Sequence, residues 1–168
     1  MSPLPTIRNA SPEDLAAIVA IYNSTVAGRM VTADLEPVTP ESRLPWFHAH
    51  NPEKRPLWVV EDTEEDIIAW MSFQDFYGRA AYNGTAEISI YIDPASRGKG
   101  LGKQLLRYCM EQAPALGVHT LLGYIFAHNE PSIRLFEQLG FEEWAHLPRI
   151  ALLDGVERGL KILGKRLY

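Results

Sequence analysis

Apolar and polar positions follow two different periods along this 168-residue chain. In the segment after Ser11-Pro12, Leu15, Ile18, Val19 and Tyr22 recur at helical spacing, and Ser followed by Pro is a typical helix start. The same spacing and boundary signals predict three further helices, at 39–50, 101–113 and 129–139. The chain is therefore expected to carry about four amphipathic helices.

Runs rich in β-branched and aromatic residues predict the strands. These runs lie at 6–8, 57–61, 67–75, 85–93, 119–126, 142–146 and 160–167. The acidic tract 62–66 and Asp154-Gly155 have the composition of turns between neighbouring strands. Segment 25–38 has no clear period and reads as an irregular element of the kind that often lines a pocket. The order β-α-α-β-β-β-α-β-α-β-β predicts one α+β domain spanning residues 1–168.

The composition mainly excludes classes of protein and kinds of site. The net charge is −5, from 16 basic and 21 acidic residues, and a nucleic-acid-binding domain would usually be basic. The single cysteine, Cys109, excludes an internal disulfide, and the absence of a Cys/His cluster with zinc spacing predicts no metal site. No apolar run approaches the roughly 20 residues that span a bilayer, and the first residues lack the apolar core of a signal peptide. We therefore expect a cytoplasmic protein without nucleic-acid or membrane partners.

A glycine-rich loop separates the strand at 85–93 from the following helix. Gly98, Gly100 and Gly102 alternate with other residues, and glycine inside a helix costs about 1 kcal/mol relative to alanine. Such a loop suits backbone N–H groups that bind an anion at a helix N-terminus. A Walker loop is excluded because Arg97 stands where its first glycine belongs, and a dinucleotide fingerprint is excluded because Lys103 replaces its last glycine.

The run Arg97-Gly98-Lys99-Gly100-Leu101-Gly102 resembles the pyrophosphate loop of the GCN5-related N-acetyltransferases (the GNAT family). A second marker of that family, Asn129-Glu130-Pro131-Ser132, follows one helix and one strand later. The resemblance covers nearly the whole chain. It implies a mixed, mostly antiparallel central sheet with a splayed parallel strand pair, flanked by about four helices, and it implies acetyl-CoA as the acetyl donor.

The resemblance also implies which residues contact the cofactor. Arg97 and Lys99 would supply positive charge to the pyrophosphate beside the loop amides, although Lys99 could equally be a solvated loop lysine. Asn129 and Ser132 would contact the pantetheine arm and the phosphates. The backbone of Ile90, Tyr91 and Ile92 would meet the pantetheine amides, much as a strand pairs with an extended partner.

A narrower resemblance concerns the acceptor. The pattern Phe73-x-x-Phe76-x-x-Arg79-x-x-Tyr82-x-x-Thr85-x-Glu87 is similar to that of phosphinothricin and methionine sulfone acetyltransferases, as is Ile21-Tyr22-Asn23. In that group the acceptor is the α-amine of a small amino-acid analogue. The resemblance therefore predicts a small-molecule amine as substrate.

Glu87 is the predicted general base, because an ammonium must lose a proton before it can attack a thioester. Strand alternation puts Glu87 on the face opposite Ile88, Ile90 and Ile92. Arg79 is the predicted ligand of the substrate carboxylate, which a guanidinium can bind with two parallel hydrogen bonds. For both residues, the alternative is an ordinary solvated charge.

Three aromatic residues, Phe73, Phe76 and Tyr82, are predicted to line the substrate pocket, with the core as the alternative for each, and Trp70 is assigned to the core. Relatives place Tyr or His where this chain has Phe136, so the group that protonates the leaving thiolate stays open. Tyr124 and water are candidates, and a CoA thiol can also leave without a dedicated acid. His128 is interpreted as a cap or surface residue rather than a catalyst.

Two other functions compete with this prediction. The enzyme could acetylate a different amine, such as a protein N-terminus, a polyamine or an aminoglycoside. Alternatively, because position 136 is Phe, the chain could be a non-catalytic acetyl-CoA sensor. The apolar run Leu160 to Leu163 and the family resemblance lead us to expect a homodimer. The physiological acceptor does not follow from the sequence.

Overall fold

The computed structural model describes residues 5–168, which form a seven-stranded sheet flanked by four helices. The strands lie in the order β1-β2-β3-β4-β5-β7-β6. Their bounds are β1 Thr6–Asn9, β2 Leu57–Glu61, β3 Ile67–Asp75, β4 Thr85–Ile92, β5 Thr120–Phe126, β6 Glu142–Leu153 and β7 Val156–Arg166. The helices are α1 Leu15–Asn23, α2 Leu44–His48, α3 Leu101–Gln112 and α4 Glu130–Gln138. This arrangement confirms the predicted α+β GNAT fold.

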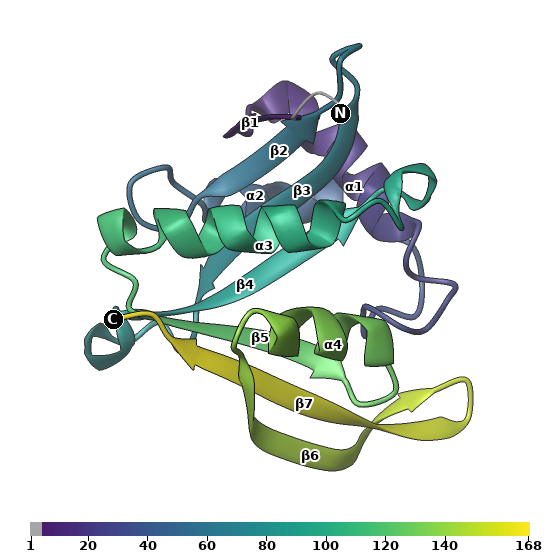
Figure 1. Ribbon diagram of the computed structural model, residues 1–168. Helices are drawn as coiled ribbons and strands as arrows, with labels where there is room; N and C mark the ends of the chain where they lie inside the picture. Colours follow the sequence, from purple (N-terminus) through teal and green to yellow (C-terminus); the bar gives the residue numbers. More distant parts are fainter. Residues whose placement is uncertain (1–4) are drawn as a thin grey trace.

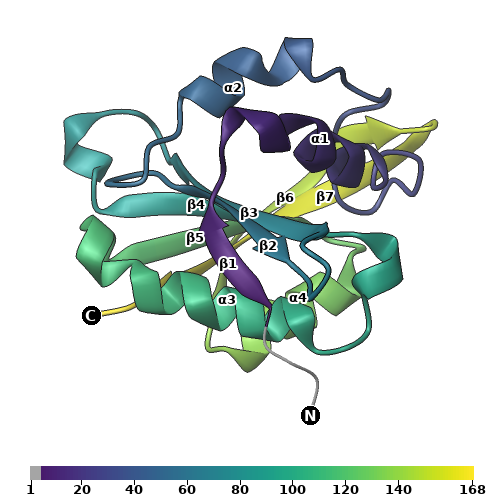
Figure 2. The same ribbon diagram turned by 90° about the horizontal axis from the view of Figure 1, so that it is seen from above.

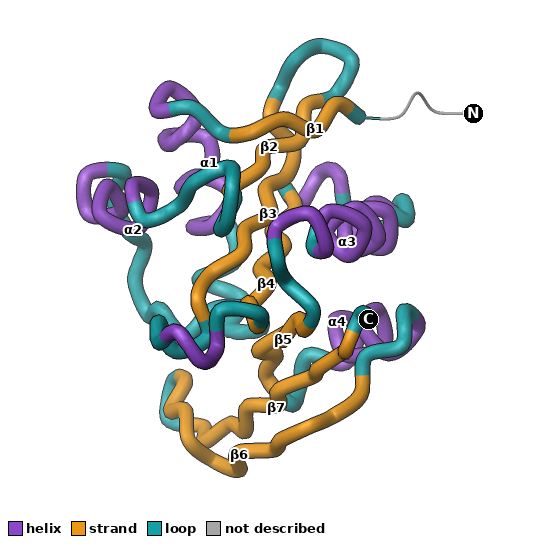
Figure 3. The backbone as a smooth tube through the Cα atoms, turned by 90° about the vertical axis from the view of Figure 1, so that its left-hand side faces the viewer, coloured by secondary structure: helices purple, strands orange, loops and turns teal. Residues whose placement is uncertain are grey.

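The helices cover the two faces of the sheet in pairs. Helices α1 and α2 lie on one face, and α3 and α4 lie on the other (Figures 2 and 3). The larger core fills the α3–α4 side, where Phe73, Met71 and Leu105 are fully buried. A smaller cluster on the α1–α2 side includes Ile18 and Trp70. The chain thus forms two apolar layers around one sheet, which is a common way to bury both sheet faces.

The sheet is antiparallel at every junction except β4–β5. These two strands are parallel, and their pairing covers only Thr85–Glu87 against Thr120–Leu122. Beyond Glu87 they diverge, which leaves a gap in the sheet between the remainder of β4 and β5 (Figure 1). The predicted splayed parallel pair is therefore present, and the divergence begins at the predicted base.

The C-terminal hairpin is longer than the sequence pattern predicts. Strand β6 continues to Leu153 and β7 begins at Val156, whereas the pattern indicated strands at 142–146 and 160–167. The ladder tolerates Pro148 and the left-handed Arg149 because its register shifts between Leu147 and Ala151. Such a bulge lets a strand continue past residues that cannot join the ladder.

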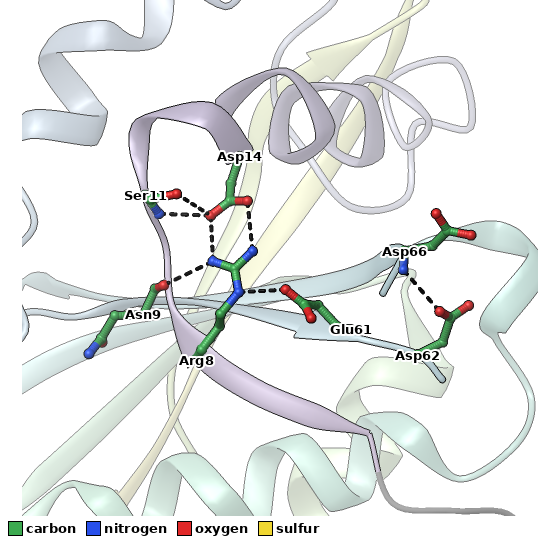
Figure 4. A network of polar contacts seen from close by, with 7 residues as sticks. All are labelled: Arg8, Asn9, Ser11, Asp14, Glu61, Asp62 and Asp66. Atoms are coloured by element: carbon green, nitrogen blue, oxygen red, sulfur yellow. Dashed lines mark hydrogen bonds and ion pairs between the residues drawn. The ribbon is translucent and has the colours of Figure 1, made fainter. Parts of the chain in front are cut away.

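An ion-pair network fixes the start of α1 against the sheet (Figure 4). The guanidinium of Arg8 on β1 donates to both carboxylate oxygens of Asp14, at 2.7 and 2.9 Å, and to Glu61 Oε1 on β2 at 2.5 Å. The Ser11 N–H donates to Asp14 Oδ2 at 2.7 Å, as in an N-terminal capping box. The network holds α1 over the sheet face that carries the site described next.

Candidate active site

A cavity of about 190 Å³ lies between the sheet and the α1–α2 layer. Its lining includes residues from α1, segment 24–43, α2, β3 and β4: Ile18, Val19, Tyr22, Val38, Arg43, Trp46, Trp70, Ser72, Gln74, Glu87, Ser89 and Tyr91. Segment 25–38 was expected to line a pocket, and Val38 does so. Among residues 5–168, two charged side chains line the cavity, Glu87 and Arg43.

Strand alternation builds the sheet side of the cavity. The register pairs Trp70 with Tyr91, Ser72 with Ser89 and Gln74 with Glu87, all across β3 and β4. These residues point to the α1–α2 side because successive side chains in a strand alternate between faces. The wall is aromatic at its Trp70–Tyr91 end and polar toward Glu87.

Among the residues that the structure describes, Glu87 has a partly buried carboxyl group without a side-chain partner. The side chain is partly buried in the cavity, and burial raises the pKa of its carboxyl group. Within residues 5–168, no side-chain hydrogen bond or ion pair engages it. An unpaired carboxylate with a raised pKa is a stronger base than a solvated one and is free to accept a substrate proton.

A second polar group in the cavity also lacks a partner. Ser72 is 1% exposed, and its Oγ makes no hydrogen bond within the described part of the chain. Burying a hydroxyl without a partner costs about 1–3 kcal/mol, so such groups usually meet a ligand or water. Ser72 and Glu87 together make the cavity suited to a polar molecule.

Aromatic rings line the end of the cavity that lies away from Glu87. Trp70 and Tyr91 stack with their centroids 4.5 Å apart, and Trp46 packs edge-on against Trp70 at 5.3 Å. Trp70 Nε1 donates to the Ile18 carbonyl at 3.1 Å, which ties the wall to α1. The assignment of Trp70 to the core is confirmed, and its ring also lines the cavity.

Arg43 is a charged cavity residue that the sequence analysis missed, as it also missed Ser72 and Gln74. It ends a 3-10 turn, Glu41–Arg43, just before α2, and its Nη2 donates to Asp34 Oδ2 at 2.7 Å. Its guanidinium carbon lies 4.7 Å from the centroid of the Tyr22 ring. The available signal was the spacing of Arg43 and Trp46, which puts both on one side of a helical turn.

The predicted carboxylate ligand, Arg79, has a different position. It is exposed and caps the 3-10 turn Ala80–Tyr82 in the loop between β3 and β4, and it does not line the cavity. Phe76 and Tyr82 contact each other in the same loop, with ring centroids 5.5 Å apart, and Tyr82 is 44% exposed. The structure therefore does not bring Arg79 and Glu87 together in the cavity.

The prediction that Phe73 lines the pocket is wrong. Phe73 is fully buried in the α3–α4 core and packs edge-on against Trp58, with centroids 5.2 Å apart. Its side chain points away from the cavity because Ser72 and Gln74, its neighbours on β3, point toward it.

The gap between β4 and β5 leaves the later backbone groups of β4 without a partner strand on that side in the described part of the sheet. The Asp93 N–H donates to the Ile68 carbonyl of β3. In an antiparallel strand, the backbone groups of successive residues point alternately to the two sides, so those of Tyr91, two residues earlier, also face β3. The backbone groups of Ile90 and Ile92 then face the gap. An extended chain with amide groups, such as pantetheine, can pair with them. The geometry favours Ile90 and Ile92 for this role over the backbone of Tyr91, whose side chain lines the cavity.

The predicted phosphate loop lies directly after that strand end. Gly98 and Gly100 both have φ of 77°, a left-handed conformation that favours glycine, and Gly100 caps the 12-residue helix α3. Arg97 Nε donates to the Ile92 carbonyl at 3.1 Å, and Lys99 is exposed. Consecutive backbone N–H groups of this kind at a helix N-terminus form an anion site.

Leu101 and Gly102 form the first turn of α3. A side chain at Gly102 would approach Leu135 of α4 within 3.2 Å, so this glycine also permits close packing of α3 and α4.

Asn129 has a structural function of its own. It is buried, its Oδ1 accepts from the Ser132 N–H at 3.4 Å as the N-cap of α4, and its Nδ2 donates to the Met30 carbonyl at 3.1 Å. Ser132 is partly exposed in the first turn of α4. Asn129 thus connects the predicted cofactor helix to the segment that leads to the cavity.

The structure also shows where the residues considered as proton donors to the thiolate lie. Phe136 is buried in the main core beside Gly123 and Phe141. Tyr124 is partly buried on β5, and burial first and the charge of Glu87 second raise the pKa of its hydroxyl. His128 accepts from or donates to no side chain in residues 5–168, and its Nε2 contacts the Arg29 carbonyl at 2.8 Å. Of these residues, only Tyr124 is a polar group close to the base.

Two other features are absent from residues 5–168. No helix among them is both long and apolar enough to cross a membrane. No group of three or more His, Cys, Asp or Glu residues there has the arrangement of a metal site.

The chain matches the model of the acetyltransferase (GNAT) family over residues 13–141. It is 57% identical over 162 residues to the "Putative phosphinothricin acetyltransferase YwnH" of Bacillus subtilis, covering 96% of this chain and 99% of that protein. It is 35% identical over 145 residues to an L-methionine sulfoximine/L-methionine sulfone acetyltransferase of Pseudomonas paraeruginosa, covering 86% of this chain and 84% of that protein.

Among solved structures, yncA of Salmonella typhimurium, determined with its cofactor acetyl-CoA, superimposes with a TM-score of 0.89 at 32% identity. The match covers 99% of this chain and 95% of yncA. The matches extend through the glycine loop, the splayed strand pair and the strand that carries Glu87. The chain therefore belongs to the GNAT family and is an acetyl-CoA-dependent N-acetyltransferase.

Proposed function

We propose that the protein transfers the acetyl group of acetyl-CoA to the α-amine of a small amino-acid analogue of the phosphinothricin, methionine sulfone or methionine sulfoximine type. One observation carries the proposal: the unpaired Glu87 carboxylate lies in a small polar cavity at the point where β4 and β5 separate. The names of two relatives, which refer to phosphinothricin and to methionine sulfoximine, support the same acceptor class.

In the proposed reaction Glu87 takes a proton from the acceptor ammonium, directly or through a water molecule. The free amine attacks the thioester carbon, and a backbone N–H of β4 at the gap, such as that of Ile90, donates to the oxyanion. The nitrogen of the tetrahedral intermediate loses its second proton to solvent, and the intermediate collapses to the acetylated amine and the CoA thiolate. The proton then passes from Glu87 to solvent, and Tyr124 is the described residue best placed to protonate the thiolate.

Acetyl-CoA would be held by three parts of the chain. The backbone of Ile90 and Ile92 would pair with pantetheine in the gap. The loop Arg97–Gly102 would bind the pyrophosphate with its amides and with the charges of Arg97 and Lys99. Ser132 and the remaining hydrogen-bonding capacity of Asn129 would contact the cofactor at the start of α4. Arg79, with Phe76 and Tyr82 in the same loop between β3 and β4, remains a candidate for contact with the acceptor.

The test is thiol release from acetyl-CoA with a panel of amines. We expect turnover with the amino-acid analogues and a loss of about a hundredfold or more in kcat for Glu87→Gln, the usual range for general base catalysis. Acetyl-CoA affinity should stay unchanged in this variant. Turnover only with polyamines, aminoglycosides or peptide N-termini would contradict the acceptor class, and tight acetyl-CoA binding without any turnover would favour a sensor.

We also propose a homodimer, although not through the segment that first indicated it. The run Leu160 to Leu163 lies on β7, between β5 and β6, and Leu163 is fully buried. Exposed apolar side chains instead gather on the outer strand β6 and its turn: Leu147, Ile150, Leu152 and Val156. An exposed apolar edge strand is a typical pairing surface, and a second copy of this chain is the occupant we propose.

Light scattering after size-exclusion chromatography measures the oligomer directly. The wild-type protein should have twice the mass of one chain, and Leu152→Asp should give a monomer. Tyr168→Asp, at an equally exposed residue of the C-terminus, is the control for added charge. A wild-type monomer at high micromolar concentration would contradict the dimer.

A further inference from the structure

Arg43 and Glu87 lie toward opposite ends of the cavity. Tyr91 stands near Arg43, because its ring lies 5.3 Å from that of Tyr22, over which the Arg43 guanidinium sits at 4.7 Å. Glu87 and Tyr91 are four residues apart on one strand, which separates their backbones by about 13 Å. A ligand that reaches both charges must therefore be extended rather than compact.

The pKa shifts of Tyr91 and Glu87 agree with this separation of Arg43 from Glu87. Burial first, and then the neighbouring Tyr22, raises the pKa of the Tyr91 hydroxyl. Arg43 lowers this pKa and Glu87 raises it to a smaller extent, so both charges act on the tyrosine between them. Burial alone raises the pKa of Glu87, with no contribution from Arg43. The two charges thus do not neutralise each other.

Arg43 also has N–H donors that make no hydrogen bond within residues 5–168. One nitrogen, Nη2, is used by Asp34, and no other hydrogen bond of its guanidinium occurs within residues 5–168. Asp34 is itself held by the Tyr22 hydroxyl, and the Asp34 N–H donates to Thr32 Oγ1 at 3.2 Å. Because a guanidinium has five N–H donors in a fixed plane, the pair with Asp34 orients Arg43 and leaves most of its donors available.

We infer that Arg43 is a specificity-determining residue that binds the oxygens of the acceptor's side chain: a phosphinate, sulfone or sulfoximine group. This inference rests on the proposed function, in which the α-amine lies at Glu87. The α-carboxylate is attached to the same carbon as that amine, so it stays near Glu87. Only the far end of the side chain extends along the Ser72–Ser89 pair toward Arg43 and the Trp46 and Trp70 rings.

The inference explains how one cavity selects oxidised side chains. A site with an unmet donor disfavours an analogue that lacks the matching acceptor, because the partly buried donor is then left without a partner in the cavity. Methionine has the length of methionine sulfone but none of its sulfonyl oxygens. The wild-type enzyme should therefore prefer the sulfone, and this preference should depend on Arg43.

The experiment measures kcat/KM for L-methionine sulfone and L-methionine with the wild type and Arg43→Met. We expect the variant to lose about 10- to 100-fold on the sulfone, the range for one charged hydrogen bond, and to change by less than about threefold on methionine. Arg134→Met, at an exposed arginine of α4, is the matched control and should leave both values unchanged.

The outcomes separate the two proposals. An equal loss on both acceptors, with wild-type turnover intact, would overturn the assignment of Arg43 and would mean that it binds the α-carboxylate or only supports the fold. No wild-type turnover on either acceptor would overturn the proposed function and this inference with it. If Arg43→Met does not fold, Arg43→Lys keeps the charge without the planar donors and should still lower the sulfone-to-methionine ratio. The thermal shift caused by methionine sulfone alone gives a second readout of binding.

Discussion

The two faces of the β3–β4 ribbon differ although they share one backbone. On the α3–α4 face, Met71, Phe73 and Ile88 are at most 4% exposed and pack in a purely apolar core. On the α1–α2 face, the polar side chains of Ser72, Gln74 and Glu87 line a cavity, and Ser72 Oγ is buried without a partner. Apolar packing stabilises the first face, whereas the second carries buried polar groups that the fold leaves unsatisfied. One face therefore supports the fold, and the other carries the proposed active site at some cost in stability.

The largest expected effect is a difference in the free energy of unfolding between a variant of the core face and a variant of the cavity face. Phe73→Ala should lower the free energy of unfolding by about 3–5 kcal/mol, because it removes a buried ring and leaves a cavity. Gln74→Ala, the neighbouring residue on the cavity face, should change it by less than about 1 kcal/mol. Chemical denaturation measures both values. Similar losses in the two variants would show that the faces do not differ in this way.

A smaller effect tests the loop that extends the cavity face toward the cofactor. Gly100→Ala should weaken acetyl-CoA binding, because a non-glycine residue at φ of 77° is strained by about 1–2 kcal/mol and would relax the loop. Gly155, in the β6–β7 turn, has φ of 79° and equally open surroundings, so Gly155→Ala is a matched control. Calorimetric titration with acetyl-CoA should show a loss of affinity in the first variant only. The same loss in both would mean that general strain, rather than the phosphate loop, is responsible.

The smallest expected effect is the loss of stability that the buried Glu87 carboxylate causes when it is ionised. Since burial raises the pKa of Glu87 in the folded protein, the folded state holds this proton more tightly than the unfolded state. The contribution of Glu87 to stability therefore decreases as the pH rises from its unfolded pKa through its raised folded pKa. Glu87→Gln should melt slightly higher than the wild type at neutral pH, and the difference should shrink near pH 4. A variant that melts lower at neutral pH would contradict a destabilising ionised Glu87.

Local signals in the chain predicted most of the fold. Helical periods and caps located α1, α3 and α4, and alternating apolar residues located β2 to β5, because such patterns depend on which side of an element is buried. The hairpin β6–β7 was predicted too short, since the bulge around Pro148 depends on pairing between strands and not on local composition.

By itself the sequence determined the family, the glycine loop, and the placement of Glu87 on the face opposite Ile88 and Ile90. These features are local, since a loop, a helix start and a strand period each involve neighbouring residues. Only the tertiary structure decided which distant side chains share the cavity with Glu87. It placed Arg43 there rather than Arg79, and it moved Phe73 into the core. The physical reason is that a cavity forms where separate elements pack, and the packing of α1 and α2 on the sheet is not encoded in any single segment.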